Sequence, residues 1–145
     1  MTSKLINNNG TKTFAVVFRD GDEVVEQLSK FAGKNKLNAS QFTGIGAFSE
    51  VTLGFFDFAQ KDYNRNEIKE QVELLSLVGD ITRYNNEHKI HAHVVVGKSN
   101  GAAFGGHLLK AIVHPTVELI ITESHAFLER QMDEATGLPL IKIEK

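Results

Sequence analysis

Three histidines stand at spacings that could build a metal site. His91 and His93 are separated by one residue, and His107 follows the glycine-rich segment 101–106 (GAAFGG). The chain has no cysteine, which excludes disulfides, thiolate nucleophiles and cysteine-based zinc sites. A transition-metal site in this chain must therefore use histidine and carboxylate ligands, and its six histidines are the first residues to consider.

The pattern around His91 and His93 predicts a strand that points both imidazoles to one side. In residues 88–96 (HKIHAHVVV), a period of two places the two histidines together on one face. The opposite face is apolar and holds Ile90, Ala92, Val94 and Val96. Two residues along a strand span about 6.6 Å. Two imidazoles can lean across that gap to reach one ion at the ~2.0–2.1 Å of a zinc–nitrogen bond.

His107 is the expected third ligand. The preceding glycines allow the chain to return tightly and its backbone to approach the site closely. Three neutral imidazoles around a tetrahedral zinc leave one position for water or substrate, which is typical of a catalytic rather than a structural site. We therefore predict a divalent transition metal at His91, His93 and His107, with zinc as the expected ion and iron, nickel and cobalt as alternatives.

The other candidates allow more than one interpretation. His88 stands beside a predicted turn, where a solvated side chain is expected. His114 and His125 could join the site, although a histidine in such a context is more often an ordinary residue. Glu118 is a lone charge in an apolar segment, and it either faces solvent or orients a ligand imidazole and moves a proton. It is the candidate catalytic residue.

The elements that would position these residues begin with a strand and a helix. Residues 13–18 (TFAVVF) predict the strand, and residues 20–22 (DGD) predict a turn with an aspartate cap for the helix that follows. Apolar side chains recur at helical spacing from Val24 to Ala32, and Gly33 or Asn35 can end that helix. We expect the helix to cover one face of a sheet.

Strands dominate the rest of the chain. Short apolar runs predict strands over 42–48, 51–58, 72–81, 89–96, 117–122, 127–132 and 140–143. Residues 60–66 and 85–87 are interpreted as hairpin connections, and 108–113 as a further short helix or strand. The sequence therefore predicts an α+β fold, mainly antiparallel, in one domain over residues 1–145.

Composition narrows the classes of partner. The chain of 145 residues is 41% hydrophobic, which suits one domain with one core. Sixteen Lys and Arg against 18 Asp and Glu give a net charge of −2, so no general attraction draws the chain to nucleic acid. Neither an apolar run near the ~20 residues of a membrane span nor an export signal is present. We expect a cytoplasmic protein without a membrane partner.

Several segments together resemble one known family. They are residues 44–49 (GIGAFS), 51–54 (VTLG), 70–81 (EQVELLSLVGDI), 91–97 (HAHVVVG), 101–108 and 117–121 (VELII). In order and spacing they are similar to bacterial and archaeal members of the plants and prokaryotes conserved (PPC) family over most of residues 10–144. The resemblance implies a seven-stranded, largely antiparallel sheet with a flanking helix, usually assembled as a homotrimer, and a metal at His91, His93 and His107.

The resemblance implies more than one function. The family is associated with DNA binding and regulation, although this chain lacks the arginine-glycine-arginine-proline AT-hook of the plant relatives. A more distant similarity to acetolactate decarboxylase, which holds zinc on a His-x-His pair plus a later histidine, implies a metal-dependent lyase or hydrolase acting on a small organic acid. In a third interpretation the ion only stabilises the fold.

Overall fold

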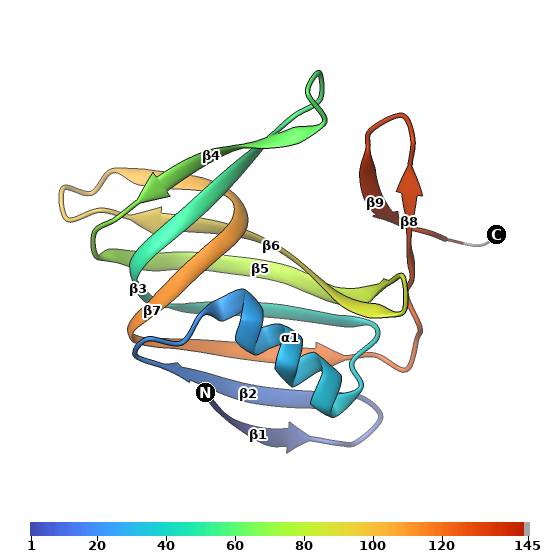
Figure 1. Cartoon of the computed structure of the whole chain (residues 1–145). Coiled ribbons are helices and arrows are strands. Elements are labelled where there is room, and N and C mark those ends of the chain that lie inside the picture. Colours follow the sequence, from blue (N-terminus) through green and yellow to red (C-terminus); the bar gives the residue numbers. More distant parts are fainter. Residues whose placement is uncertain (144–145) are drawn as a thin grey trace.

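A seven-stranded antiparallel sheet forms the body of the computed structural model, which describes residues 1–143 (Figure 1). Its strand order is β1-β2-β7-β6-β5-β3-β4, and β8 and β9 form a separate hairpin. The element bounds are β1 (Thr2–Asn7), β2 (Lys12–Arg19), α1 (Val24–Asn35), β3 (Ser40–Asp57), β4 (Asp62–Ile68), β5 (Val72–Tyr84), β6 (Glu87–Gly97), β7 (Ala103–Glu123), β8 (Arg130–Asp133) and β9 (Leu138–Ile141). The predicted α+β, mainly antiparallel fold is confirmed.

Four strands pair in a closed circuit. β3 pairs with β5, β5 with β6, β6 with the first residues of β7, and β7 returns to β3. The long β7 bends as it leaves β6 and runs on between β3 and β2 (Figure 1). This curvature brings the start of β7, which carries His107, beside the middle of β6.

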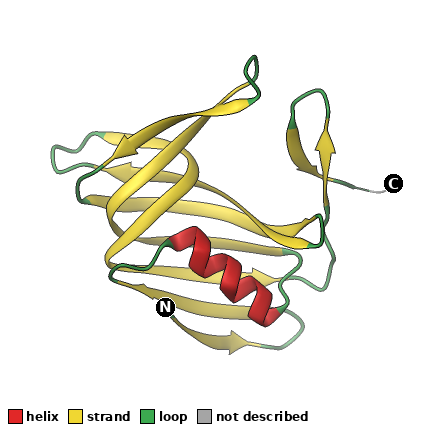
Figure 2. Cartoon of the chain, viewed as in Figure 1, coloured by secondary structure: helices red, strands yellow, loops and turns green. Residues whose placement is uncertain are grey.

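Helix α1 covers one face of the sheet (Figure 2). Its N-cap is Glu23, whose carboxylate accepts hydrogen bonds from the backbone N–H groups of Val25 at 3.2 Å and Glu26 at 2.6 Å. The predicted aspartate cap is therefore wrong. Asp22 instead accepts from the backbone N–H of Arg19 at 2.9 Å and pairs with the amino terminus, so that its carboxylate closes the turn before the helix.

The two faces of the sheet differ in cover. The face under α1 holds the core, in which Phe18, Phe48 and Leu28 are fully buried. On the other face large apolar side chains remain exposed, and we call this set the outer apolar face: Val17, Ile45, Leu75, Val78, Val95 and Ile120. Cross-strand register extends this face to the histidines, because Val78 is the partner of His93. Directly paired residues of antiparallel strands point to the same side.

The strand predictions failed where polar residues form strands and where two runs join. Residues 60–66 were expected to be a connection, yet β4 spans Asp62–Ile68 and pairs with β3 through its backbone. Its side chains are mostly exposed, so no apolar alternation marks it. Runs 42–48 and 51–58 join in β3, and 108–113 and 117–122 join in β7. The sequence analysis did not predict the edge strand β1. The predicted turn at 85–87 is confirmed, since Asn85 and Asn86 have positive φ.

The length of the helix shows whether it could span a membrane. Among residues 1–143 no helix is long and apolar enough to cross a bilayer, and α1 has 12 residues.

Candidate metal centre

The three predicted histidines meet on one side of the sheet. His91 and His93 lie on β6, and His107 on β7 is the direct cross-strand partner of His93. One nitrogen from each ring lies within 4.8 Å of the corresponding atoms of the other two. The ring centroids are 5.2 Å apart for His91 and His93, 5.2 Å for His91 and His107, and 5.6 Å for His93 and His107. The predicted convergence of the imidazoles is confirmed.

Glycine at position 106 permits this arrangement. A Cβ atom at Gly106 would lie 2.8 Å from the carbonyl oxygen of Gly54 on β3, a distance that real Cβ contacts do not reach. A Cβ at Gly105 would lie 3.1 Å from the carbonyl oxygen of Val94 on β6. Because no side chain holds β7 away from its two neighbours, the strand lies close enough to present His107 to the pair on β6.

The cluster fits a metal ion in size. An ion equidistant from three atoms 4.8 Å apart would lie about 2.8 Å from each, against the ~2.0–2.1 Å of a zinc–nitrogen bond. A shift of about 0.7 Å per ring closes that difference. In addition, Nδ1 of His107 is buried and has no hydrogen-bond partner among residues 1–143. Coordination through that nitrogen would satisfy it.

Desolvation favours the uncharged form of two of these rings, those of His107 and His93. Desolvation, followed by charge on the neighbouring His91 and His93, lowers the pKa of His107 to about 4. Desolvation and His91 also lower the pKa of His93. At neutral pH His93 and His107 therefore keep the free lone pairs that metal coordination requires. Tyr63 of β4 stacks on His107 with centroids 4.7 Å apart and holds that ring in place, and burial raises the pKa of its phenol.

Asp80 occupies the position of an orienting carboxylate. It is the cross-strand partner of His91, and its Oδ2 lies 3.5 Å from Nδ1 of that histidine. Its Oδ1 accepts a 2.7 Å hydrogen bond from Nη2 of Arg130. Burial alone would raise the pKa of Asp80, but the hydrogen bonds and charges of His91 and Arg130 lower it, so it is a carboxylate at neutral pH.

Two contacts of His91 require different tautomers. Nη2 of Arg130 lies 3.4 Å from Nδ1 of His91, and a guanidinium can only donate, so that contact needs a bare Nδ1. The Asp80 contact needs a proton on the same nitrogen. Coordination of a metal through Nε2 would place the proton on Nδ1, which would then donate to Asp80. This is the carboxylate–histidine–metal arrangement that is common around zinc.

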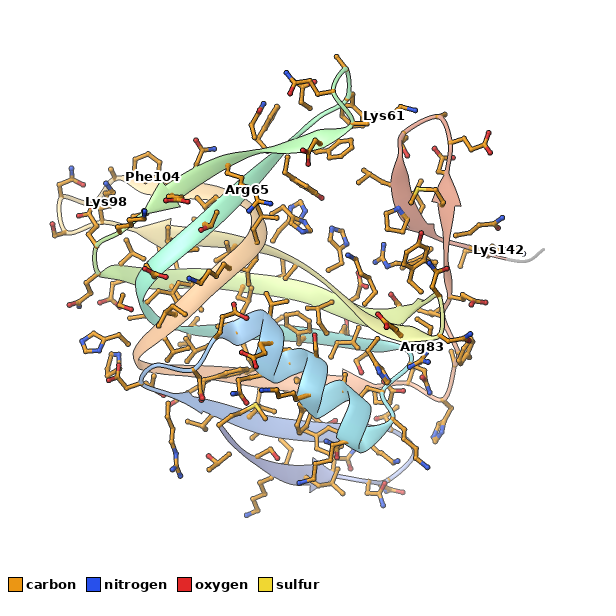
Figure 3. All side chains as sticks on the ribbon, viewed as in Figure 1. Lys61, Arg65, Arg83, Lys98, Phe104 and Lys142 are labelled. Carbon is orange, nitrogen blue, oxygen red and sulfur yellow. The ribbon has the colours of Figure 1, made fainter. Side chains whose placement is uncertain are left out.

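Arg130 ties the β8–β9 hairpin to this site. Its side chain is 6% exposed. Its Nε donates to Oγ1 of Thr82 at 2.8 Å, and its Nη1 donates to the carbonyl oxygen of Pro139 on β9 at 2.9 Å. At the far tip of the hairpin, Nζ of Lys61 in the β3–β4 turn donates to the carbonyl oxygen of Glu134 at 2.7 Å (Figure 3). Two hairpins distant in sequence therefore lie beside the histidines and contact each other.

A cavity of about 200 Å³ lies beside His91 and His107, between these hairpins. Tyr63, Lys89 and Arg130 contribute its polar walls. Its apolar walls are Leu109, Leu138, Pro139 and Leu140. His93 does not line the cavity and is exposed toward the outer apolar face, so the cluster is open on two sides.

The structure places Glu118 elsewhere. Its cross-strand partners are Val17 and Ile45, and it lines a groove with Leu75 and Pro115 on the outer apolar face. Within one chain it is not brought to the three histidines. The orienting position is held by Asp80, which sequence reasoning missed, because a carboxylate in the run 72–81 does not by itself show that it pairs with His91.

The remaining histidines also lie apart from the cluster. The ring nitrogens of His88 lie 3.0 Å from Nη1 of Arg83 near the β5–β6 turn. His114 pairs with Asp20 through a 2.7 Å contact, and His125 is exposed after the end of β7. Of the residues described, only His91, His93 and His107 form a cluster able to hold a metal.

Comparison with known proteins decides the family. Residues 6–125 match the Plants and Prokaryotes Conserved (PCC) domain. The chain belongs to this family, also abbreviated PPC. Among curated PPC relatives, the bifunctional protein GlmU of Synechococcus sp. (strain JA-3-3Ab) is 30% identical over 128 residues, which are 86% of this chain and 19% of that protein. The chain therefore spans about a fifth of the length of that relative.

Several solved structures resemble this chain over most or all of its length. A metal-containing protein from Archaeoglobus fulgidus is 29% identical, with 99% of each chain covered and a TM-score of 0.85. A "putative DNA-binding protein" from Bacteroides thetaiotaomicron is 27% identical, with 99% of each chain covered and a TM-score of 0.88. A Staphylococcus aureus protein similar to alpha-acetolactate decarboxylase shares the fold alone, with 14% identity over 84% of this chain and 53% of that one, and a TM-score of 0.56.

Replacing Asp80 tests its orienting role. Asp80→Asn keeps the size of the side chain but removes the charge that holds the Nδ1 proton of His91, and we expect the affinity for zinc to fall by about 10- to 100-fold. The measurement is competition with a chromogenic chelator. Glu87→Gln, an exposed carboxylate at the start of β6, is the matched control and should leave the affinity unchanged. Equal affinities of the Asp80 variant and the unaltered protein would contradict the role.

Proposed function

We propose that this PPC protein holds a divalent transition metal, with zinc as the expected ion, on His91, His93 and His107 and offers it to a small molecule in the adjoining cavity. The convergence of three imidazoles beside that cavity carries the proposal. The Archaeoglobus fulgidus relative, described as metal-containing, supports it. When bound, an ion with an open position polarises a carbonyl oxygen or lowers the pKa of a water ligand.

The reaction class that suits this site is lyase or hydrolase chemistry on a small organic acid. In this proposal Asp80 keeps His91 in the coordinating tautomer, Tyr63 fixes the ring of His107, and the two hairpins limit the access of water. Glu118 would act in proton transfer only if the assembled protein brought it to the site, because within one chain it lies in a separate groove.

Removal of one ligand tests the metal site. We expect the unaltered protein, purified without an affinity tag, to carry about one ion per chain and His93→Ala to carry a small fraction of that, since a two-imidazole site binds less tightly. Elemental analysis measures this. His125→Ala, which changes an exposed loop histidine, is the control and should keep the ion. Metal-free unaltered protein, or full metal content in His93→Ala, would contradict the proposal.

Chelation separates a functional ion from a purely structural one. A metal that binds only the folded chain stabilises it by about 2.7 kcal/mol when its free concentration is 100 times its Kd. A lower melting temperature after chelation is therefore expected in either case. Loss of turnover on a panel of 2-oxo and 2-hydroxy acids after chelation, with recovery on zinc addition, would identify the functional ion. Absence of turnover throughout the panel would remove the enzymatic form of the proposal.

The outer apolar face supports assembly into a homotrimer. Six apolar side chains on neighbouring strands are at least one third exposed, from Val17 at 37% to Ile45 at 62%. Contiguous exposed apolar surface of this kind is typical of subunit contacts. The face also carries Glu118 and ends at His93, so that a neighbouring subunit would cover the open side of the cluster.

A charge on this face tests the assembly. Ile120→Lys places an ammonium group in the centre of the outer apolar face, and we expect the mass in solution to fall from that of three chains to that of one. Sedimentation equilibrium measures it. Leu5→Lys, an equally exposed position at 45% on the edge strand β1, should remain trimeric. A monomeric unaltered protein would contradict trimer formation.

DNA association is the second candidate function. The name of the Bacteroides thetaiotaomicron relative favours it. The charges give it less support, because Lys61, Arg65, Arg83 and Lys98 lie at separate places around the molecule rather than on one surface (Figure 3). Several lysines are also paired with acids: the exposed Lys69 with Glu67, the half-buried Lys98 with Glu70 and the exposed Lys110 with Glu50.

Salt dependence tests DNA association. If the chain neutralises phosphates, its affinity for duplex DNA must fall steeply with added salt, because bound cations are released. Fluorescence anisotropy of a labelled duplex at several salt concentrations measures this. Absence of binding at low ionic strength would remove the DNA candidate and leave the metal proposal intact.

A further inference from the structure

We infer that the cavity beside His91 and His107 binds a small monocarboxylate, whose charged group meets the ammonium of Lys89 and whose short apolar tail packs against the β8–β9 hairpin. The metal contribution to this binding rests on the proposed function, whereas the roles of Lys89 and the hairpin stand on the geometry of this chain. Three properties of the cavity carry the inference: its charge, its size and its apolar walls.

Lys89 supplies an uncompensated positive charge. It precedes His91 by two residues on β6, so both side chains lie on the same face of the strand, and both line the cavity. Among residues 1–143 Lys89 has no hydrogen-bond or ion-pair partner. Within the described part of the chain, no acidic side chain lines the cavity either. The local field therefore favours an anion, and a bound metal ion would add to it.

The charge of Arg130, the other cation in the cavity wall, is already paired with Asp80. Its Nε, Nη1 and Nη2 are already engaged by Thr82, Pro139 and Asp80. The guanidinium therefore acts as a structural support for the cavity wall, and its charge is balanced by Asp80. Among the residues described, Lys89 is therefore the lining cation without an acidic partner.

The volume of the cavity limits the ligand. A water molecule takes up about 30 Å³ in the liquid. The cavity volume of about 200 Å³ therefore corresponds to roughly six or seven non-hydrogen atoms. A carboxylate with two to four further carbons matches this size. Nucleotides, sugar phosphates and peptides are too large to enter completely.

The apolar walls select a carboxylate with a tail over a fully polar anion. Leu109 comes from β7, whereas Leu138, Pro139 and Leu140 come from β9. The three β9 side chains belong to the hairpin that Arg130 and Lys61 hold over the site. Each CH₂ group that an alkyl tail buries strengthens binding by roughly fourfold, a gain that inorganic phosphate cannot have.

Calorimetric titration of the zinc-loaded full chain with butyrate tests the inference. We expect binding of butyrate and at least about tenfold weaker binding of butyramide, its uncharged isostere, because only the carboxylate interacts with Lys89 as a charge-assisted pair. Lys89→Met should weaken butyrate binding by about tenfold or more, and Lys89→Arg should retain it. Lys12→Met, an exposed lysine on β2, is the matched control and should bind as the unaltered chain does.

Tail contacts are tested by chain length. Leu138→Ala should weaken butyrate binding by about threefold or more while leaving acetate unchanged, and inorganic phosphate should bind less tightly than butyrate. Equal binding of butyrate and butyramide, or unaltered binding by Lys89→Met, would overturn the inference. Metal content is measured on the same samples. A chain without metal would refute the proposed function, whereas the Lys89 and Leu138 comparisons on that chain would still decide the inference.

Discussion

The antiparallel register between β6 and β7 is the constraint on which the site depends. It sets His107 directly opposite His93, while the period of two along β6 brings His91 to the same side. A shift of this register by one residue would turn His107 to the other face of the sheet. Gly106 allows the register, because a Cβ atom there would collide with the backbone of β3. Three ligands on two rigid strands are thereby held in place before any ion arrives.

A second layer of contacts joins the site to the C-terminal hairpin. One oxygen of Asp80 accepts a hydrogen bond from Arg130, and the other lies next to His91. Arg130 also donates a hydrogen bond to the carbonyl oxygen of Pro139. One buried arginine therefore connects the tautomer of a ligand histidine to the wall of the cavity. The hairpin begins after residue 125, where the match to the family domain ends, so the histidines lie within the matched residues and this cavity wall lies outside them.

The parts predicted correctly from the sequence are those with local signals. The alternation of residues 88–96 and the glycines before His107 indicated a three-histidine cluster, and the family resemblance added the seven-stranded sheet. Asp80 and Arg130 were missed because their roles follow from cross-strand register and from the fold of the hairpin, which no local pattern encodes. Glu118 was favoured as a lone carboxylate in an apolar run, yet such a residue can equally lie on an exposed sheet face. β4 was missed because backbone pairing, rather than apolar alternation, holds it in the sheet.

The most direct test of the account is a crystal structure of the protein purified without an affinity tag, with anomalous diffraction recorded on both sides of the zinc absorption edge. The account predicts one ion per chain, about 2.0–2.1 Å from a nitrogen of each of His91, His93 and His107, with a further position open to solvent or ligand. The account would be contradicted by an ion bound at other residues, or by rings of these histidines that stay at the present spacing in crystals grown with saturating zinc.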